Sequence, residues 1–160
     1  TNLGQVITSA MAHAFDPPLE GAMVNGGSIR LDDFLEGGIT PIDFFRVLPF
    51  GDGVLKVQMT GALLSEILSY GEAQKGDGAY LQRYGLEQGI DQLWHIGGNR
   101  IVPDQLYWIA ISEFLMQGYD IPFLTPDNPG VRSVIFPKVD ALAADIRQSI
   151  IQYLKHEKIK

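Results

Sequence analysis

Apolar side chains recur every three or four residues in four parts of the chain, which is the spacing that predicts amphipathic helices. The first helix is expected to begin at Thr1 or Asn2, either of which can cap it, and to end before the Asp-Pro-Pro sequence that follows. Capping threonines also open the helices predicted at 40–50 and 61–74. The fourth helix is expected to span 138–160, with an inward face made of Leu142, Ile146, Ile150 and Leu154.

Shorter apolar segments predict strands, because they either alternate with polar residues or are apolar throughout. They predict a buried strand at 21–25, a half-buried one at 53–60, one strand over 79–88, short strands around a glycine turn at 96–103, and a strand buried on both faces at 105–112. We expect an irregular segment at 113–122 and a loop at 124–133. The chain, residues 1–160, is therefore expected to form one α+β domain with a mixed β-sheet flanked by helices.

The charge balance narrows the classes of partner. A net charge of −7 with no basic cluster argues against nucleic acid and against a polybasic membrane contact. No apolar run is long enough to predict membrane insertion, and cysteine is absent, so thiolate and disulfide chemistry are excluded. The chain starts with threonine and enters a helix at once, from which we expect a mature or excised piece of a longer protein.

The residues that most often carry catalysis do not assemble into a set. His13, His95 and His156 are far apart in sequence, and none has a second metal ligand at helical or turn spacing, so no metal site is predicted. No serine stands in a strand–turn–helix elbow. The adjacent Asp32 and Asp33 lie in a polar stretch and are expected to be a solvated pair.

The glycine-rich stretch NGGSIR, residues 25–30, is the first candidate for a binding element. It lacks the lysine of a nucleotide-triphosphate loop and the third glycine of a dinucleotide fingerprint. Two interpretations remain open on spacing alone. The stretch is either a surface turn with a solvated charge, or a backbone shaped around a ligand at which Arg30 is aimed.

Two aromatic residues in loops favour the ligand interpretation. Phe50 stands between a proline and a glycine at a helix-to-strand corner, and Phe114 follows a buried strand, six residues before Asp120. Two rings about 7 Å apart can hold a planar base between them. An aspartate beside them can accept hydrogen bonds from a diol. With Arg30, these residues would form a nucleoside pocket at one end of the sheet.

The segments NLGQVITSAM, VNGGSIR, GGITPIDFFRVLPFGD, VQMTGALLSEILSYG, YLQRYGL and VPDQLYWIAISEFLMQGYD together resemble the C-terminal domain of the bacterial 5′-nucleotidase family. That family includes UDP-sugar hydrolases and 2′,3′-cyclic-nucleotide phosphodiesterases. The resemblance runs from Thr1 to about Phe123. It implies a separate N-terminal metallophosphatase domain with two divalent metal ions, such as zinc or manganese, to which this domain presents a nucleotide. It also implies a periplasmic or cell-surface location.

The resemblance assigns substrate-binding roles to five residues. Arg30 is similar to an arginine that contacts the substrate, Phe50 and Phe114 to the stacking pair, and Asp120 to the acid that binds the ribose hydroxyls. The fifth, Asp52, follows the PFG motif. The backbone of the pocket is expected to come from Asn25, Gly26, Gly27 and Gly51. No catalytic or metal-binding residue and no bound cofactor are expected within this chain.

Two departures from the family pattern bear on the ligand. Asp52 stands where the family usually has asparagine, and an ionised aspartate only accepts hydrogen bonds. Either the base preference differs from adenine, or the side chain points away. Tyr119 replaces a glycine, which would narrow the pocket or displace Asp120.

Three functional hypotheses follow. The first is the nucleotide-recognition domain of a metal-dependent phosphohydrolase, inactive as a fragment. The second is a non-catalytic binding or interaction module that keeps the fold and no longer binds nucleotides. The third is a member of the same enzyme family acting on a non-nucleotide ester.

Overall fold

The computed structural model describes residues 2–30 and 40–158. Its α-helices are α1 (Asn2–His13), α2 (Pro41–Val47), α3 (Gly61–Ala73) and α4 (Ile146–Lys158). Its strands are β1 (Gly21–Asn25), β2 (Val54–Thr60), β3 (Leu81–Tyr84), β4 (Leu86–Gln88), β5 (Trp94–Ile96), β6 (Asn99–Arg100), β7 (Leu106–Ser112) and β8 (Val131–Ile135). Single 3-10 turns are η1 (Gly26–Ser28), η2 (Leu115–Gln117) and η3 (Leu142–Ala144).

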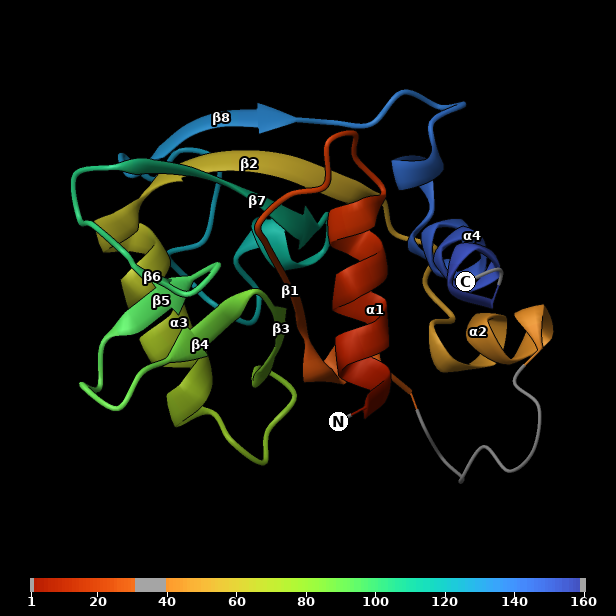
Figure 1. The fold of residues 1–160 in the computed structure, drawn as a ribbon, viewed down its shortest axis with the longest axis horizontal. Helices are drawn as coiled ribbons and strands as arrows, with labels where there is room; N and C mark the ends of the chain where they lie inside the picture. Colours follow the sequence, from red (N-terminus) through yellow and green to blue (C-terminus); the bar gives the residue numbers. More distant parts are fainter. Residues whose placement is uncertain (1, 31–39, 159–160) are drawn as a thin grey trace.

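The main sheet is mixed, as the sequence predicts. Five described strands lie in the order β3-β1-β7-β2-β8, and β4-β5-β6 form a separate small sheet. β1 runs parallel to β7, whereas the other neighbouring pairs of the main sheet are antiparallel. α1 and α4 pack on one side of the main sheet, and α3 and the small sheet lie toward the other (Figure 1). The predicted α+β class is confirmed.

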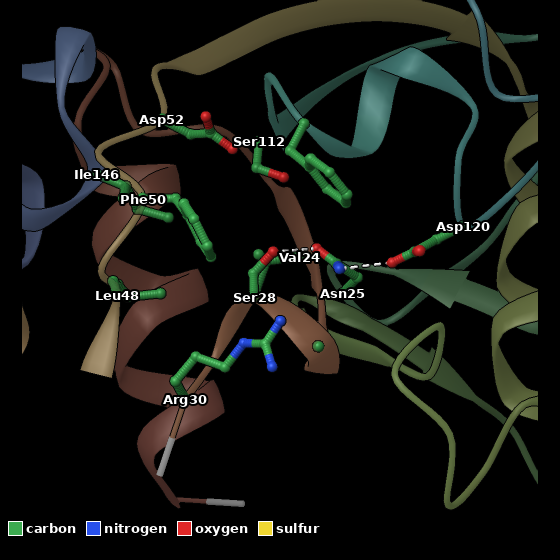
Figure 2. A pocket seen from close by; sticks show the side chains of 12 residues that line it. Val24, Asn25, Ser28, Arg30, Leu48, Phe50, Asp52, Ser112, Asp120 and Ile146 are labelled. Carbon is green, nitrogen blue, oxygen red and sulfur yellow. Dashed lines mark hydrogen bonds between the residues drawn. The ribbon is translucent and has the colours of Figure 1, made fainter. Parts of the chain in front are cut away.

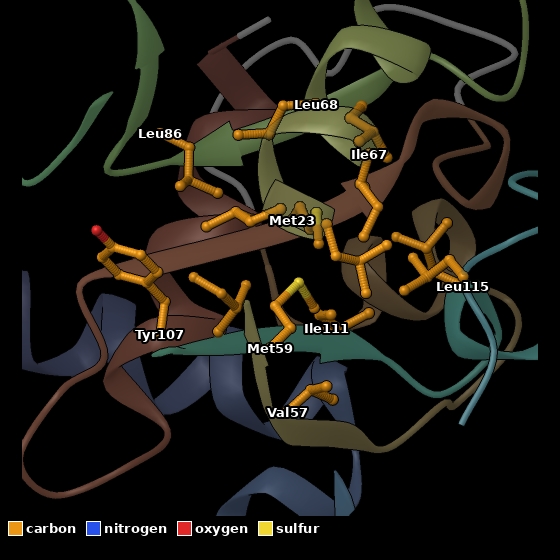
Figure 3. Close-up of a cluster of buried hydrophobic side chains, with 14 of the residues drawn as sticks. Met23, Val57, Met59, Ile67, Leu68, Leu86, Tyr107, Ile111 and Leu115 are labelled. Carbon is orange, nitrogen blue, oxygen red and sulfur yellow. The ribbon is translucent and has the colours of Figure 1, made fainter. Parts of the chain in front are cut away.

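Each central strand divides its side chains between two hydrophobic clusters, because neighbouring residues of a strand point to opposite faces. Met23, Ile109 and Ile111 belong to the cluster beneath α3, which Figure 3 shows. Ala22 and Ala110 belong to the cluster beneath α1 and α4. Both faces of the sheet are therefore covered along its central strands β1 and β7.

Three sequence predictions are wrong in part. The single strand expected at 79–88 is two strands in different sheets, because Gly85 adopts a positive φ of 66° between them. The loop expected at 124–133 contains the start of β8, which pairs with β2. The predicted last helix begins at Ile146 rather than 138, and Leu142 lies in η3, where it is exposed.

The late start of α4 has a capping cause. The carboxylate of Asp145 accepts a hydrogen bond from the backbone N–H of Arg147 at 2.8 Å, which is the contact that an N-cap residue makes. Thr60 caps α3 in the same way, through the N–H of Leu63 at 3.2 Å. None of the helices in the described chain combines the length and the apolar character needed to cross a membrane. Thr1, one of the two residues expected to cap α1, lies outside the described residues.

Candidate functional site

A pocket of about 320 Å³ opens at one edge of the main sheet (Figure 2). Its lining residues come from several separate segments: Val24, Asn25, Gly27, Ser28, Arg30, Leu48, Phe50, Asp52, Ser112, Phe114, Asp120 and Ile146. The topology explains this gathering. β1 and β7 are parallel and end at the same edge, and the antiparallel β2 begins there.

All five residues to which the sequence assigns substrate binding line this one pocket: Arg30, Phe50, Asp52, Phe114 and Asp120. Of the four expected backbone positions, Asn25 and Gly27 line it. Gly26 and Gly51 are not among the lining residues. The pocket thus brings together residues that are distant in the chain, such as Asn25 and Asp120, which are 95 positions apart.

Asn25 organises the polar side of the pocket. It is the last residue of β1 and is only 2% exposed. Its side-chain amide donates a hydrogen bond to the Asp120 carboxylate at 2.5 Å, and its carbonyl oxygen accepts one from the Ser28 hydroxyl at 2.6 Å (Figure 2). Because both ends of the amide are engaged, the carboxylate of Asp120 is held in one orientation at the pocket.

The glycine pair after Asn25 packs the pocket loop against a neighbouring loop. The N–H of Gly26 donates to the carbonyl of Tyr80 at 2.7 Å, and the N–H of Gly27 donates to that of Gly78 at 2.8 Å. A Cβ on Gly27 would lie 3.3 Å from the Cα of Gly78. The two backbone N–H groups are therefore used within the chain, and the glycines permit a close approach of two backbones.

Arg30 supplies a cation at the open side of the pocket. Its backbone N–H donates to the carbonyl of Val47 at 2.7 Å, which fixes the backbone of Arg30 against the end of α2. Its side chain is exposed, and Figure 2 shows the guanidinium reaching toward Ser28. An exposed guanidinium can pair with an anion through two parallel hydrogen bonds.

Two phenylalanine rings supply the apolar surface. Phe50 is 62% exposed and lines the pocket, so its ring is available to a ligand. Phe114 is half-buried, and its ring lies 5.8 Å from that of Tyr119 at an angle of 35°. Tyr119 itself is exposed and is not among the lining residues, while Asp120 is. The substitution of tyrosine for glycine thus leaves Asp120 at the pocket.

Asp52 is a half-buried carboxylate in the wall of the pocket. Burial raises its pKa, a hydrogen bond from the backbone N–H of Phe114 acts in the opposite direction, and the nearby charge of Glu113 raises it further. Its backbone carbonyl accepts a hydrogen bond from the N–H of Ile146 at 2.9 Å. Of the two sequence alternatives for Asp52, the structure supports a side chain that faces the pocket rather than one that points away.

The first turn of α4 holds the Phe50 loop. The guanidinium of Arg147 pairs with Asp145, with Nη2 2.7 Å from Oδ2, and lies 4.4 Å from the ring centre of Phe45. A Cβ on Gly51 would lie 2.1 Å from the same Nη2. Gly51 therefore permits close packing between the loop and α4, outside the pocket itself. The pairing lowers the pKa of Asp145 and raises that of Arg147.

Several lining residues are not predicted from the sequence, among them Ser112 and Ile146. Ser112 is 2% exposed at the end of β7, and its hydroxyl oxygen accepts a hydrogen bond from the N–H of Leu115 at 3.3 Å. A serine that ends an otherwise apolar strand was the available signal. The apolar spacing assigns Ile146 to the core, where it is 2% exposed, and gives no signal that it also borders the pocket.

Other candidates from the sequence do not join this site. His13 contacts the carbonyl of Ser9, and His95 lies 3.7 Å from Asp91 on the small sheet. Among residues 2–30 and 40–158, no three His, Asp or Glu side chains are placed to hold a metal ion. Asp32 and Asp33 lie outside the described residues.

Comparison with known proteins identifies the fold and its family. The protein-family model described as 5′-nucleotidase, C-terminal domain, matches residues 1–125. The chain belongs to this family. A 5′-nucleotidase from Vibrio cholerae is 33% identical over 148 residues, which cover 89% of this chain and 26% of that protein. This 5′-nucleotidase C-terminal domain therefore spans about a quarter of the curated relative that it matches.

Solved structures share the fold of this C-terminal domain. A 5′-nucleotidase precursor from Thermus thermophilus superimposes with a TM-score of 0.75 at 24% identity, covering 98% of this chain and 32% of that one. A NAD nucleotidase from Haemophilus influenzae gives a TM-score of 0.71 at 15% identity, covering 96% and 29%. The family match ends before β8 and α4, so Ile146 and Arg147 lie beyond it.

Proposed function

We propose that this chain is the nucleotide-recognition domain of a metal-dependent phosphohydrolase of the 5′-nucleotidase type. The observation that carries the proposal is the convergence of Phe50, Phe114, Asp120 and Arg30 on one pocket from separate segments. This set matches the parts of a nucleotide: an aromatic base, a diol and an anionic phosphate. The family membership and the 5′-nucleotidase relatives support the same reaction class.

Each residue has a distinct role in this proposal. Phe50 and Phe114 stack on the two faces of the base, and an aromatic contact of this kind contributes about 1–3 kcal/mol. Asp120, oriented by Asn25, accepts hydrogen bonds from the ribose hydroxyls. Arg30 neutralises the phosphate at the open side of the pocket.

The hydrolytic chemistry would come from an N-terminal metallophosphatase domain of the full-length protein. Two divalent metal ions there would activate the attacking water and stabilise the transferring phosphoryl group. This domain would bind the nucleoside part and deliver the phosphate. The full-length protein would act in the periplasm or at the cell surface, as is implied by the family that the sequence resembles.

Binding to the isolated 160-residue chain tests the proposal. We would titrate isotope-labelled protein with AMP, GMP, adenosine and uridine by NMR, beside Phe50→Ala and Phe114→Ala. Phe136→Ala is the matched control, because Phe136 is also exposed and does not line the pocket. We expect shifts at the pocket with a Kd near 1 mM, about −4 kcal/mol, since half of the composite site is absent.

The two pocket variants should weaken binding at least about fivefold, by the stacking energy given above, and the control should not. An absence of shifts at about ten times the expected Kd would overturn nucleotide recognition by this chain. Shifts that persist unchanged in both pocket variants would overturn the stacking assignment.

A second candidate function is a non-catalytic binding module. Asp52 and Tyr119 favour it, because both depart from the family pattern, Asp52 in the pocket wall and Tyr119 beside the ring of Phe114. The sequence of the gene upstream of this chain distinguishes the enzyme from the binding module. An upstream segment with Asp/His and Asn-His-Glu metal ligands supports the enzyme, and a gene without one supports the module. Upstream metal ligands combined with failure on nucleotides would indicate a non-nucleotide ester as substrate.

A further inference from the structure

We infer that the pocket selects guanine among the nucleobases, and that the Asp52 carboxylate is the selecting group. The inference rests on the proposed function, since it requires a base between Phe50 and Phe114. It adds the identity of the base, which neither the family membership nor the relatives specify.

The backbone places Asp52 beside the stacking rings. Val54 pairs with Ser112 across β2 and β7, and the carbonyl of Gly53 accepts a hydrogen bond from the N–H of Glu113 at 2.9 Å. At the next residue of each segment, the Asp52 carboxylate accepts a hydrogen bond from the backbone N–H of Phe114. Asp52 is thus fixed to the segment that carries one ring, and it lies two positions after the other ring at Phe50.

Asp52 lies in the part of the pocket where we expect the base of the nucleotide, and not where we expect the phosphate. Figure 2 shows Asp52 and Ser112 at the end of the pocket away from Arg30. If Arg30 takes the phosphate and the rings take the base, the edge of the base faces Asp52 and Ser112. A second carboxylate, Asp120, is engaged with Asn25 at another side of the pocket.

Only guanine offers this carboxylate two neighbouring donors. An ionised carboxylate accepts hydrogen bonds and donates none, and its two oxygens hold about four acceptor positions. Guanine presents N1–H and the 2-amino group side by side. Adenine and cytosine each present one amino group next to a ring nitrogen lone pair, and uracil flanks its single N–H with two carbonyls. The hydrogen bond from Phe114 leaves acceptor positions for both guanine donors.

Ser112 is placed to complete the recognition. Its oxygen accepts from Leu115, and within the described part of the chain no hydrogen bond uses its own hydrogen. That hydrogen can be donated to the guanine O6, where adenine carries an amino group instead. A polar site built for one donor pattern discriminates strongly against bases that leave its groups unpaired.

The test compares GMP, IMP and AMP as ligands of the 160-residue chain by NMR titration. IMP differs from GMP only by the absence of the 2-amino group. We expect GMP to bind at least about tenfold more tightly than IMP, as for one hydrogen bond to a charged group, and more tightly again than AMP. In Asp52→Asn, the GMP-to-IMP ratio should fall below about threefold. Asp104→Asn, at an exposed carboxylate outside the pocket, should keep the full ratio.

Equal binding of GMP and IMP to the unmodified chain would overturn the inference, whatever the variants do. A preference that survives in Asp52→Asn would also overturn it. If the three nucleotides bind alike and Phe50→Ala abolishes binding, the guanine inference fails and the proposed function stands. If none of them binds, the proposed function fails and the inference falls with it.

Discussion

The side-chain amide of Asn25, at the end of β1, donates a hydrogen bond to the carboxylate of Asp120, 95 residues later. The amide is buried, and its oxygen is already occupied by Ser28. The ends of β1 and of the segment after β7 are therefore joined by a side chain that can take only one orientation. This contact between residues that are distant in sequence helps to set the shape of the pocket.

Replacing Asn25 by alanine should impair both stability and ribose recognition. Asn25→Ala removes a hydrogen bond to a charged group, which we expect to lower the free energy of unfolding by about 1–3 kcal/mol. Because Asp120 loses its orientation, affinity for AMP should also fall, by about tenfold for a bond of this strength. Urea denaturation and NMR titration measure the two effects.

The ribose specificity of the Asn25 effect has its own controls. A 2′,3′-dideoxy nucleotide lacks the hydroxyls that Asp120 is proposed to bind, so its affinity should change little between the two proteins. Asn99→Ala replaces an exposed asparagine on β6 and should leave both measurements unchanged. An equal loss for the ribo- and dideoxynucleotide would contradict the assigned role of Asp120.

The pairing of Arg147 with Asp145 should stabilise the Phe50 loop through α4. Arg147→Lys keeps the charge and loses the two-pronged contact and the planar group over Phe45. Since this guanidinium is largely buried, we expect a loss of about 1–2 kcal/mol at pH 7 in urea denaturation. Arg132→Lys, at an exposed arginine on β8, is the matched control and should cost less than about 0.5 kcal/mol.

The effect of Arg147→Lys should also depend on pH. The arginine hydrogen bond lowers the pKa of Asp145 below its ordinary value of 3.8. The stability that this pair contributes is therefore fully present above pH 3.8 and is lost as the pH falls through the lower pKa of the folded state. The difference in free energy of unfolding between the unmodified chain and Arg147→Lys should shrink on acidification. A constant difference would show that the ion pair is not its source.

Helix and strand positions were predictable wherever one physical signal dominated. Alternation indicated β2, and capping threonines indicated α2 and α3, because pattern and cap agreed there. The start of α4 was not predictable from periodicity alone, since the apolar spacing extends back to Leu142. The carboxylate of Asp145 decides the start by capping the helix, and this contact was hidden behind the continuous pattern.

The side chains that line the pocket were more predictable from the sequence than the backbone hydrogen bonds that shape it. Phe50 and Phe114 stand out because large apolar residues in loops have little core to join. What the sequence could not show is which backbone groups remain free for a ligand. The N–H groups of Gly26 and Gly27 are already hydrogen-bonded to the carbonyls of Tyr80 and Gly78. These two segments are distant in sequence, so the pairing could not be predicted.

The isolated chain should not hydrolyse phosphate esters. The proposed reaction needs two metal ions, and the described residues contain no group of three ligands to hold one. We expect no release of phosphate from AMP above the metal-only background with added Mn²⁺, Zn²⁺ or Mg²⁺. Phosphate release that increases with protein concentration and is reduced in Arg30→Ala would contradict the assignment of this chain to recognition alone.

Asp52→Asn should stabilise the folded chain, and the gain should grow with pH. Burial and the charge of Glu113 raise the pKa of Asp52 above 3.8, so the folded state resists ionisation of this group. The folded protein is then favoured while Asp52 is protonated, and that contribution is lost as the pH rises through its pKa in the folded state. Asparagine keeps an oxygen for the N–H of Phe114 and carries no charge, so it avoids the loss.

Urea denaturation from about pH 3.5 to about pH 7.5 measures this difference, because the range begins near the ordinary aspartate pKa of 3.8 and extends upward from it, the direction in which the pKa of Asp52 is shifted. Asp104→Asn controls for removing one negative charge from a chain whose net charge is −7. Under the guanine inference, the ionised carboxylate of Asp52 lowers the free energy of unfolding of the free chain, but its charge is needed to bind the ligand. Saturating GMP should therefore reverse the order at about pH 7.5, stabilising the unmodified chain more than Asp52→Asn. A pH-independent gain in Asp52→Asn would show that the substitution acts through packing instead of charge.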